Sequence, residues 1–95
     1  MNKDAVLDAI KEAQKDVERS RVGFGQVINL DMKDYKYQEM SRRFRDDLLF
    51  RNGLVYALLL SDMCDDEDME YLRTLPNKPA LWIHMLDMNP KVTTD

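Results

Sequence analysis

Apolar residues near the start of the chain recur at the spacing of one helix face. The intervals are four, three and four residues, at Val6, Ile10, Ala13 and Val17. Residues at these intervals share one stripe of an α-helix, and early acids with late bases suit the helix dipole. We therefore expect a helix over residues 3–21. Gly23 and Gly25 should end it, because glycine readily adopts the left-handed conformation found at helix exits.

A second amphipathic pattern predicts a long central helix over residues 34–61. In its first half the buried stripe consists of Tyr37, Met40, Phe44 and Leu48. Opposite charges alternate every four residues at Glu39, Arg43, Asp47 and Arg51. Each such pair stabilises a helix by only ~0.2–0.5 kcal/mol, but their periodicity is typical of a solvated helix face. The preceding segment, residues 26–31, is either a loop or the start of this helix.

From Leu48 onward the central segment is apolar on every side. Three stripes follow one another: Leu48, Val55 and Leu59; Phe50, Leu54 and Leu58; Leu49, Tyr56 and Leu60. A helix that is apolar around its circumference has to be covered around its circumference, by the other helices or by a second copy of the chain. We expect a homodimer, with an interface formed by Phe50, Leu54, Leu58, Leu49, Tyr56 and Leu60.

Asn52-Gly53 lies in the middle of this segment and leaves three alternatives. Asn-Gly is typical of hairpin turns, but the flanking residues do not alternate as strands do. Gly53 could be the exit residue of a helix that ends at Arg51 or Asn52. It could also lie inside a continuous helix, at a cost of ~0.5–1 kcal/mol relative to alanine. We favour the continuous helix.

Two short helices are expected in the last third of the chain. The first covers residues 65–75, with a cap at Asp65 or a neighbour and an apolar face of Met69, Leu72 and Leu75. The second covers residues 79–88, capped by Asn77, with inward side chains at Leu81, Trp82, Met85 and Met88. Residues 91–95 should fray. The pattern thus predicts one all-α domain over residues 1–95, a compact four-helix bundle around the central helix.

Composition narrows the class of protein. The chain has 95 residues, of which 44% are hydrophobic and 34% charged, which excludes a disordered chain. Its longest apolar run, residues 54–60, is far shorter than the ~20 residues that span a bilayer. The first ten residues carry acids where a secretion signal needs an apolar core. Cys64 is the single cysteine, as expected of a reducing compartment, so we predict a cytoplasmic protein.

Acidic residues are concentrated in the last third of the chain. Residues 62–95 contain eight acidic and three basic residues, although the whole chain has a net charge of only −4. Such a surface disfavours direct nucleic-acid binding and favours a protein partner with a basic surface. The predicted partner-binding residues are Asp62, Asp65, Asp66, Glu67, Asp68, Glu70, Met63, Met69 and Tyr71. The alternative is that these acids only cap a helix and form its solvent-exposed face. Their spacing does not fit a calcium-binding loop.

Other candidate chemistry is sparse. Cys64 and His84 are the only soft metal ligands, too few for a structural zinc site, and nothing in the sequence pairs them as a nucleophile and its base. No metal, cofactor or catalytic residue is therefore expected. Arginine forks and aromatic rings suit phosphate groups, so a possible anion-binding set is Arg42, Arg45, Tyr35 and Tyr37.

These observations favour a non-enzymatic protein–protein interaction module. The expected role is a small intracellular regulator or inhibitor, comparable to small phage-encoded proteins, that docks on a basic partner surface. The alternative is a small-ligand binder or sponge that takes an anionic metabolite or nucleotide at the Arg/Tyr helix, at a subunit interface.

Overall fold

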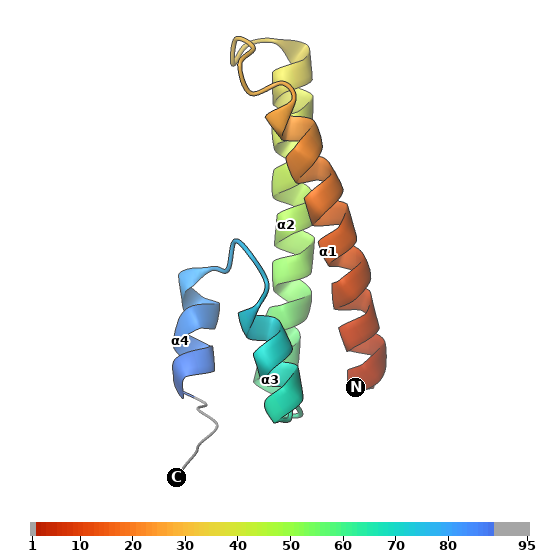
Figure 1. Ribbon diagram of the computed structural model, residues 1–95, viewed down its shortest axis with the longest axis vertical. Coiled ribbons are helices and arrows are strands. Elements are labelled where there is room, and N and C mark those ends of the chain that lie inside the picture. The colour runs from red at the N-terminus through yellow and green to blue at the C-terminus, as the bar shows by residue number, and fades with distance from the viewer. Residues whose placement is uncertain (1, 89–95) are drawn as a thin grey trace.

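The computed structural model describes residues 2–88 and contains four α-helices in that range (Figure 1). They are α1 (Lys3–Gly25), α2 (Tyr35–Ser61), α3 (Asp66–Arg73) and α4 (Ala80–Met88). No strand occurs among these residues, so the all-α prediction is confirmed. The predicted fraying of residues 91–95 lies outside the described residues. No helix between residues 2 and 88 has both the length and the apolar character needed to cross a membrane.

The two long helices form an antiparallel hairpin, and the short helices lie beside only one half of it (Figure 1). The molecule measures 52 × 26 × 16 Å, with a radius of gyration of 15.7 Å. A compact domain of this length would have a radius of gyration of about 12 Å. The four expected helices are present. Because the radius of gyration is larger than that of a compact domain, a compact bundle around the central helix is not confirmed.

Helix α1 is four residues longer than predicted and continues through both glycines to Gly25. None of the chain's glycines has a positive φ, so Gly23 and Gly25 do not act as left-handed exits. Instead, a Cβ at Gly23 would lie 2.5 Å from the Cε of Met40 on α2. The missing side chain of Gly23 therefore lets Met40 pack against α1. Glycine permits a left-handed helix exit but does not impose one, so α1 can continue through it.

Helix α2 is continuous, as favoured, and runs through Asn52-Gly53 to Ser61. Asp34 caps its start by accepting a 2.8 Å hydrogen bond from the amide of Lys36. Residues 26–31 are thus part of the connection between α1 and α2. At the other end, Asp62 has a φ of 60°, the left-handed conformation that closes a helix.

All four helices contribute to one core at the end of the hairpin where the short helices pack. Its buried members are Ile10, Val55, Leu58, Met69, Leu72, Leu75, Trp82 and Leu86. Beyond this core, α1 and α2 contact each other alone, through the aromatic residues Phe24, Tyr37 and Phe44. The Phe24 ring lies 5.2 Å from that of Tyr37, edge to face, a favourable arrangement for aromatic side chains.

The expected inward face of α4 is partly wrong. Trp82 is buried as predicted, but Leu81 and Met88 are 51% and 70% exposed, and Leu86 takes the inward position instead. The helix also lacks the predicted Asn77 cap. Asn77 has a left-handed φ of 57°, and the Pro79 carbonyl accepts hydrogen bonds from the amides of Trp82 and Ile83. This turn orients α4 so that positions 82 and 86, one helical turn apart, face the core.

Candidate protein-binding surface

The solvent-facing side of α2 changes character halfway along the helix. Its first half is exposed and mostly polar, with Tyr35, Gln38, Arg42, Arg45 and Asp46. The continuation of the same face is exposed and apolar, and we call it the apolar strip: Leu49, Phe50, Gly53, Tyr56, Ala57 and Leu60. These residues are neighbours on a helix surface, since they recur at intervals of three and four.

The side chains of the apolar strip are strongly exposed for apolar residues. Leu49, Phe50 and Leu60 are 60–64% exposed, and Tyr56 is 39% exposed. A Cβ at Gly53 would meet no atom of another described residue outside the local helix backbone within 4 Å, so the middle of the strip is open. Single exposed apolar residues are normal, but a contiguous apolar patch on a folded surface marks an interaction site.

Two residues of the predicted dimer interface do not belong to this exposed face. Leu58 is completely buried in the core, and Leu54 packs against it. The sequence placed both on one stripe with Phe50, without showing which of the three stripes the other helices cover. The interface prediction therefore narrows to Leu49, Phe50, Tyr56 and Leu60, and their role in a dimer stays a prediction.

The acidic cluster lies where α2 ends and α3 begins, and two of its members have structural roles. The amide of Asp68 donates to Asp65 Oδ1 at 2.8 Å, and the amide of Asp65 donates to Asp68 Oδ2 at 3.1 Å. This reciprocal capping box confirms Asp65 as the cap of α3. The Nζ of Lys3 also lies 2.9 Å from Asp68 Oδ2, joining α1 to α3. Its hydrogen bond holds the pKa of Asp68 below the ordinary value.

The other residues of the cluster divide between surface and core. The carboxylates of Asp62, Asp66, Glu67 and Glu70 are exposed, and we call these four residues the acidic end. Met63 is 37% exposed, but Met69 is a core residue at 4%. Tyr71 is half-buried beneath the ammonium of Lys11. Met69 is thus unable to contact a partner directly, because α3 turns it toward Leu72 and Trp82.

Arg51 is the residue that the sequence pattern misplaced most. It was expected on the solvated face, yet its side chain is completely buried. Its Nη1 donates to Gln14 Oε1 at 2.6 Å and to the Pro76 carbonyl at 2.8 Å. Its Nη2 donates to the Asn77 carbonyl at 3.1 Å. The guanidinium thereby ties α1 and the α3–α4 link to α2.

Between residues 2 and 88, no carboxylate forms an ion pair with Arg51. The Asn52 side chain accepts from its Nε and Nη2, and the Trp82 ring lies 5.1 Å from its Cζ. Burial lowers the pKa of Arg51 from its ordinary value. Its position was detectable in principle, because Leu48, Arg51, Val55 and Leu58 follow at intervals of three, four and three. The arginine continues the inward stripe.

The possible anion-binding residues do not form one cluster. Tyr37 packs against Phe24 on the inner side of the hairpin, whereas Tyr35, Arg42 and Arg45 are exposed. Arg42 already pairs with Glu39 at 2.7 Å and with Asp46 at 3.5 Å. The alternative function, binding of an anionic metabolite or nucleotide, stays a prediction.

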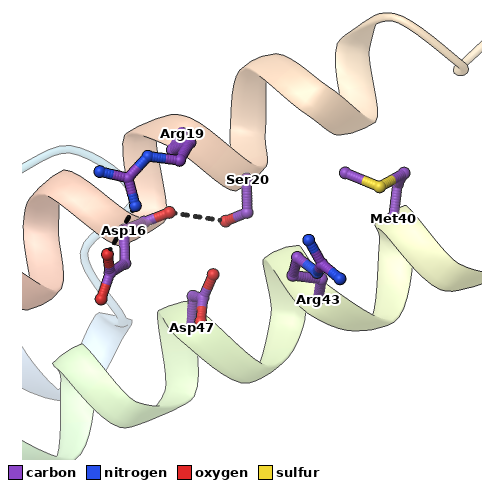
Figure 2. A pocket seen from close by; sticks show the side chains of 6 residues that line it. All are labelled: Asp16, Arg19, Ser20, Met40, Arg43 and Asp47. Atoms are coloured by element: carbon purple, nitrogen blue, oxygen red, sulfur yellow. Dashed lines mark hydrogen bonds and ion pairs between the residues drawn. The ribbon is translucent and has the colours of Figure 1, made fainter.

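A pocket of about 290 Å³ lies between α1 and α2 (Figure 2). Its lining residues are Asp16, Arg19, Ser20, Met40, Arg43 and Asp47. Arg19 Nη1 lies 2.9 Å from Asp16 Oδ1, and the Ser20 hydroxyl donates to the Asp16 carbonyl at 3.0 Å. Two positive and two negative side chains line it, so the pocket has no charge preference for an anion.

Cys64 is half-buried in the connection between α2 and α3. Burial, followed by the charge of Asp68, raises the pKa of the Cys64 thiol, which keeps it in its less nucleophilic protonated form. His84 lies on an exposed position of α4. Between residues 2 and 88, no three His, Cys, Asp or Glu side chains are placed to hold a metal ion.

No family model, curated protein or solved structure matches the chain.

Proposed function

We propose that the protein is a non-enzymatic protein–protein interaction module that docks through the apolar strip and the acidic end. The observation that carries this proposal is the change along one face of α2, polar up to Asp46 and apolar from Leu49 to Leu60. A purely solvated helix has no physical reason to change in this way. Covering the second half would remove Leu49, Phe50 and Leu60 from water, which is favourable in proportion to the apolar area buried.

The acidic end gives the proposed partner its charge. Asp62 follows directly on Ser61, the last residue of α2, so this member of the acidic end adjoins the Leu60 end of the apolar strip. We propose that one partner contacts both. Such a partner has an apolar centre and a basic edge. Charges at the rim of an interface steer association and select the partner, while the apolar centre supplies most of the affinity. Occupying a partner's surface in this way suits a small regulator or inhibitor.

The test compares two charge-matched variants. Leu49→Glu/Leu60→Glu changes the apolar strip, and Val22→Glu/Ile83→Glu adds the same charge at exposed apolar positions elsewhere, which are 47% and 46% exposed. Immobilised proteins are incubated with lysate of cells that express the chain, and each captured protein is purified for calorimetric titration. We expect binding to the wild type and the control, with at least a tenfold loss for the strip variant. Equal affinity for all three would refute the apolar strip as the docking surface.

The contribution of the acidic end is tested separately with Asp62→Asn/Glu67→Gln/Glu70→Gln. These substitutions spare Asp65 and Asp68, whose removal would also break the cap of α3. We expect weaker partner binding and a smaller dependence of affinity on salt concentration, because fewer charges face the partner. An unchanged salt dependence would show that the partner's charge lies elsewhere.

A further inference from the structure

We propose that a partner of the apolar strip is a second copy of this chain, packed antiparallel across α2. The proposal rests on the function proposed above, because it names the occupant of the same surface. Four of its residues recur at intervals of four, three and four: Leu49, Gly53, Tyr56 and Leu60. This spacing reads identically from either end. Such a spacing lets the patch meet its own copy in register across a two-fold axis.

A two-fold axis midway between Gly53 and Tyr56 pairs the two leucines with each other and the large Tyr56 with the small Gly53. Leu49 of each copy then lies opposite Leu60 of the other, and each Tyr56 lies opposite Gly53. The space beside Gly53 is open as far as residues 2–88 are concerned, since a Cβ there would meet none of their atoms within 4 Å beyond the local helix backbone. The Tyr56 side chain projects from the same face. Each tyrosine ring therefore has a hollow to occupy in the second copy.

Gly53 itself supports this arrangement, because no close contact within one copy of the described chain requires a glycine at this position. Glycine inside a helix is unfavourable relative to alanine. At Gly23 the close approach of Met40 accounts for the glycine, since a Cβ there would lie 2.5 Å from the methionine methyl group. At Gly53 no described atom approaches. A tyrosine from a second copy supplies the missing close contact.

Charge selects the antiparallel orientation. Arg45 lies one helical turn before Leu49 on the same face, is exposed and forms no ion pair with any described residue. In the antiparallel pair it lies opposite the α2–α3 connection of the second copy, next to the exposed carboxylate of Asp62. A parallel pair would instead place Arg45 beside Arg45 and Asp62 beside Asp62. Like charges in contact are unfavourable, so these charges favour the antiparallel pair.

The length of the apolar strip limits the affinity expected of the dimer. From Leu49 to Leu60 the helix rises about 16 Å. Stable protein interfaces bury ~1,200–2,000 Å² in total, and two helices that cross over this length reach only the lower end of that range. We therefore expect a dimer with a dissociation constant on the order of tens of micromolar.

Sedimentation equilibrium from about 5 to 500 µM measures the association. We expect a monomer–dimer equilibrium for the wild type and a monomer for Gly53→Leu, because the leucine fills the hollow for Tyr56. Gly53 has no positive φ, so the substitution keeps the helix, which circular dichroism verifies. A wild type that is monomeric at every concentration, or a Gly53→Leu variant that dimerises equally well, would overturn the proposal.

Thiol cross-linking determines the orientation. In a Cys64→Ser background, Leu49→Cys and Leu60→Cys variants are treated with a short bis-maleimide, separately and mixed. We expect a cross-linked dimer only in the mixture, whereas cross-linking of Leu49→Cys with itself would refute the antiparallel pair. If the chain is monomeric but another protein binds the apolar strip, the dimer is refuted and the proposed function stands. If neither binds there, both fall.

Discussion

Replacing Arg51 by methionine removes the buried guanidinium while keeping a side chain of similar length. Arg51 is completely buried and donates five hydrogen bonds to four acceptors. Two of these acceptors are the carbonyls of Pro76 and Asn77, which belong to the link between α3 and α4. The substitution therefore cuts the polar attachment of that link to α2.

Two opposing effects determine the magnitude. Methionine avoids the desolvation of a charge that has no carboxylate partner, which is favourable. Against this, each buried acceptor left without a donor costs ~1–3 kcal/mol. Pro76 and Asn77 lie at the surface, where water can reach their carbonyls in part, so we take the lower part of that range for them. We expect a net loss of about 2–4 kcal/mol, a large share of the ~5–10 kcal/mol typical of a domain this size.

Chemical denaturation followed by circular dichroism measures this loss as a lower midpoint. Trp82 provides a local probe, because it is the chain's single tryptophan, is 1% exposed and lies 5.1 Å from the Arg51 Cζ. Its fluorescence should shift to the red if the link detaches. Arg51→Lys should lose most of the same stability, since one ammonium cannot reproduce the guanidinium fork. Arg19→Met, at an exposed ion pair, serves as the control and should leave the midpoint unchanged.

Two results would contradict this reasoning. If Arg51→Met unfolds at the same denaturant concentration as the wild type, with unchanged Trp82 emission, the hydrogen bonds of Arg51 make no net contribution. Equal stability of Arg51→Lys and the wild type would show that one charge suffices and that the five-bond geometry is incidental.

Two further predictions concern stability. Gly53→Ala should raise the free energy of unfolding of the monomer by about 0.5–1 kcal/mol, because the position is helical and open; a lower denaturation midpoint at low protein concentration would contradict this. The pKa of Asp68 is lowered by Lys3, so this pair stabilises the fold above the unfolded-state pKa near 3.8 and loses its effect as pH falls below it. The stability difference between the wild type and Lys3→Met should therefore shrink between pH 5 and pH 2, as measured by urea denaturation, and a constant difference would exclude the pair as its source.

Part of the candidate surface could be predicted from the sequence. Asp65 or a neighbouring residue was expected to cap α3, and the structure confirms Asp65, which forms a capping box with Asp68. The ion pair from Lys3 to Asp68 joins residues 65 positions apart, and no local pattern indicates it. Met69 was assigned to the partner surface because it lies among exposed acids in sequence, although the helix turns it inward.

The four helices could be predicted from local sequence, because helix formation depends on intervals of three and four residues that are visible along the chain. The sequence also showed that the second half of α2 is apolar on more than one side. Which side of α2 each residue faces became clear only from the packing of the helices. Burial depends on residues far apart in sequence: Arg51 became a core residue because Gln14 and Pro76 reach it, and Leu58 because α3 and α4 fold over it. The same packing left the strip around Gly53 open, because the short helices cover only the opposite side of α2.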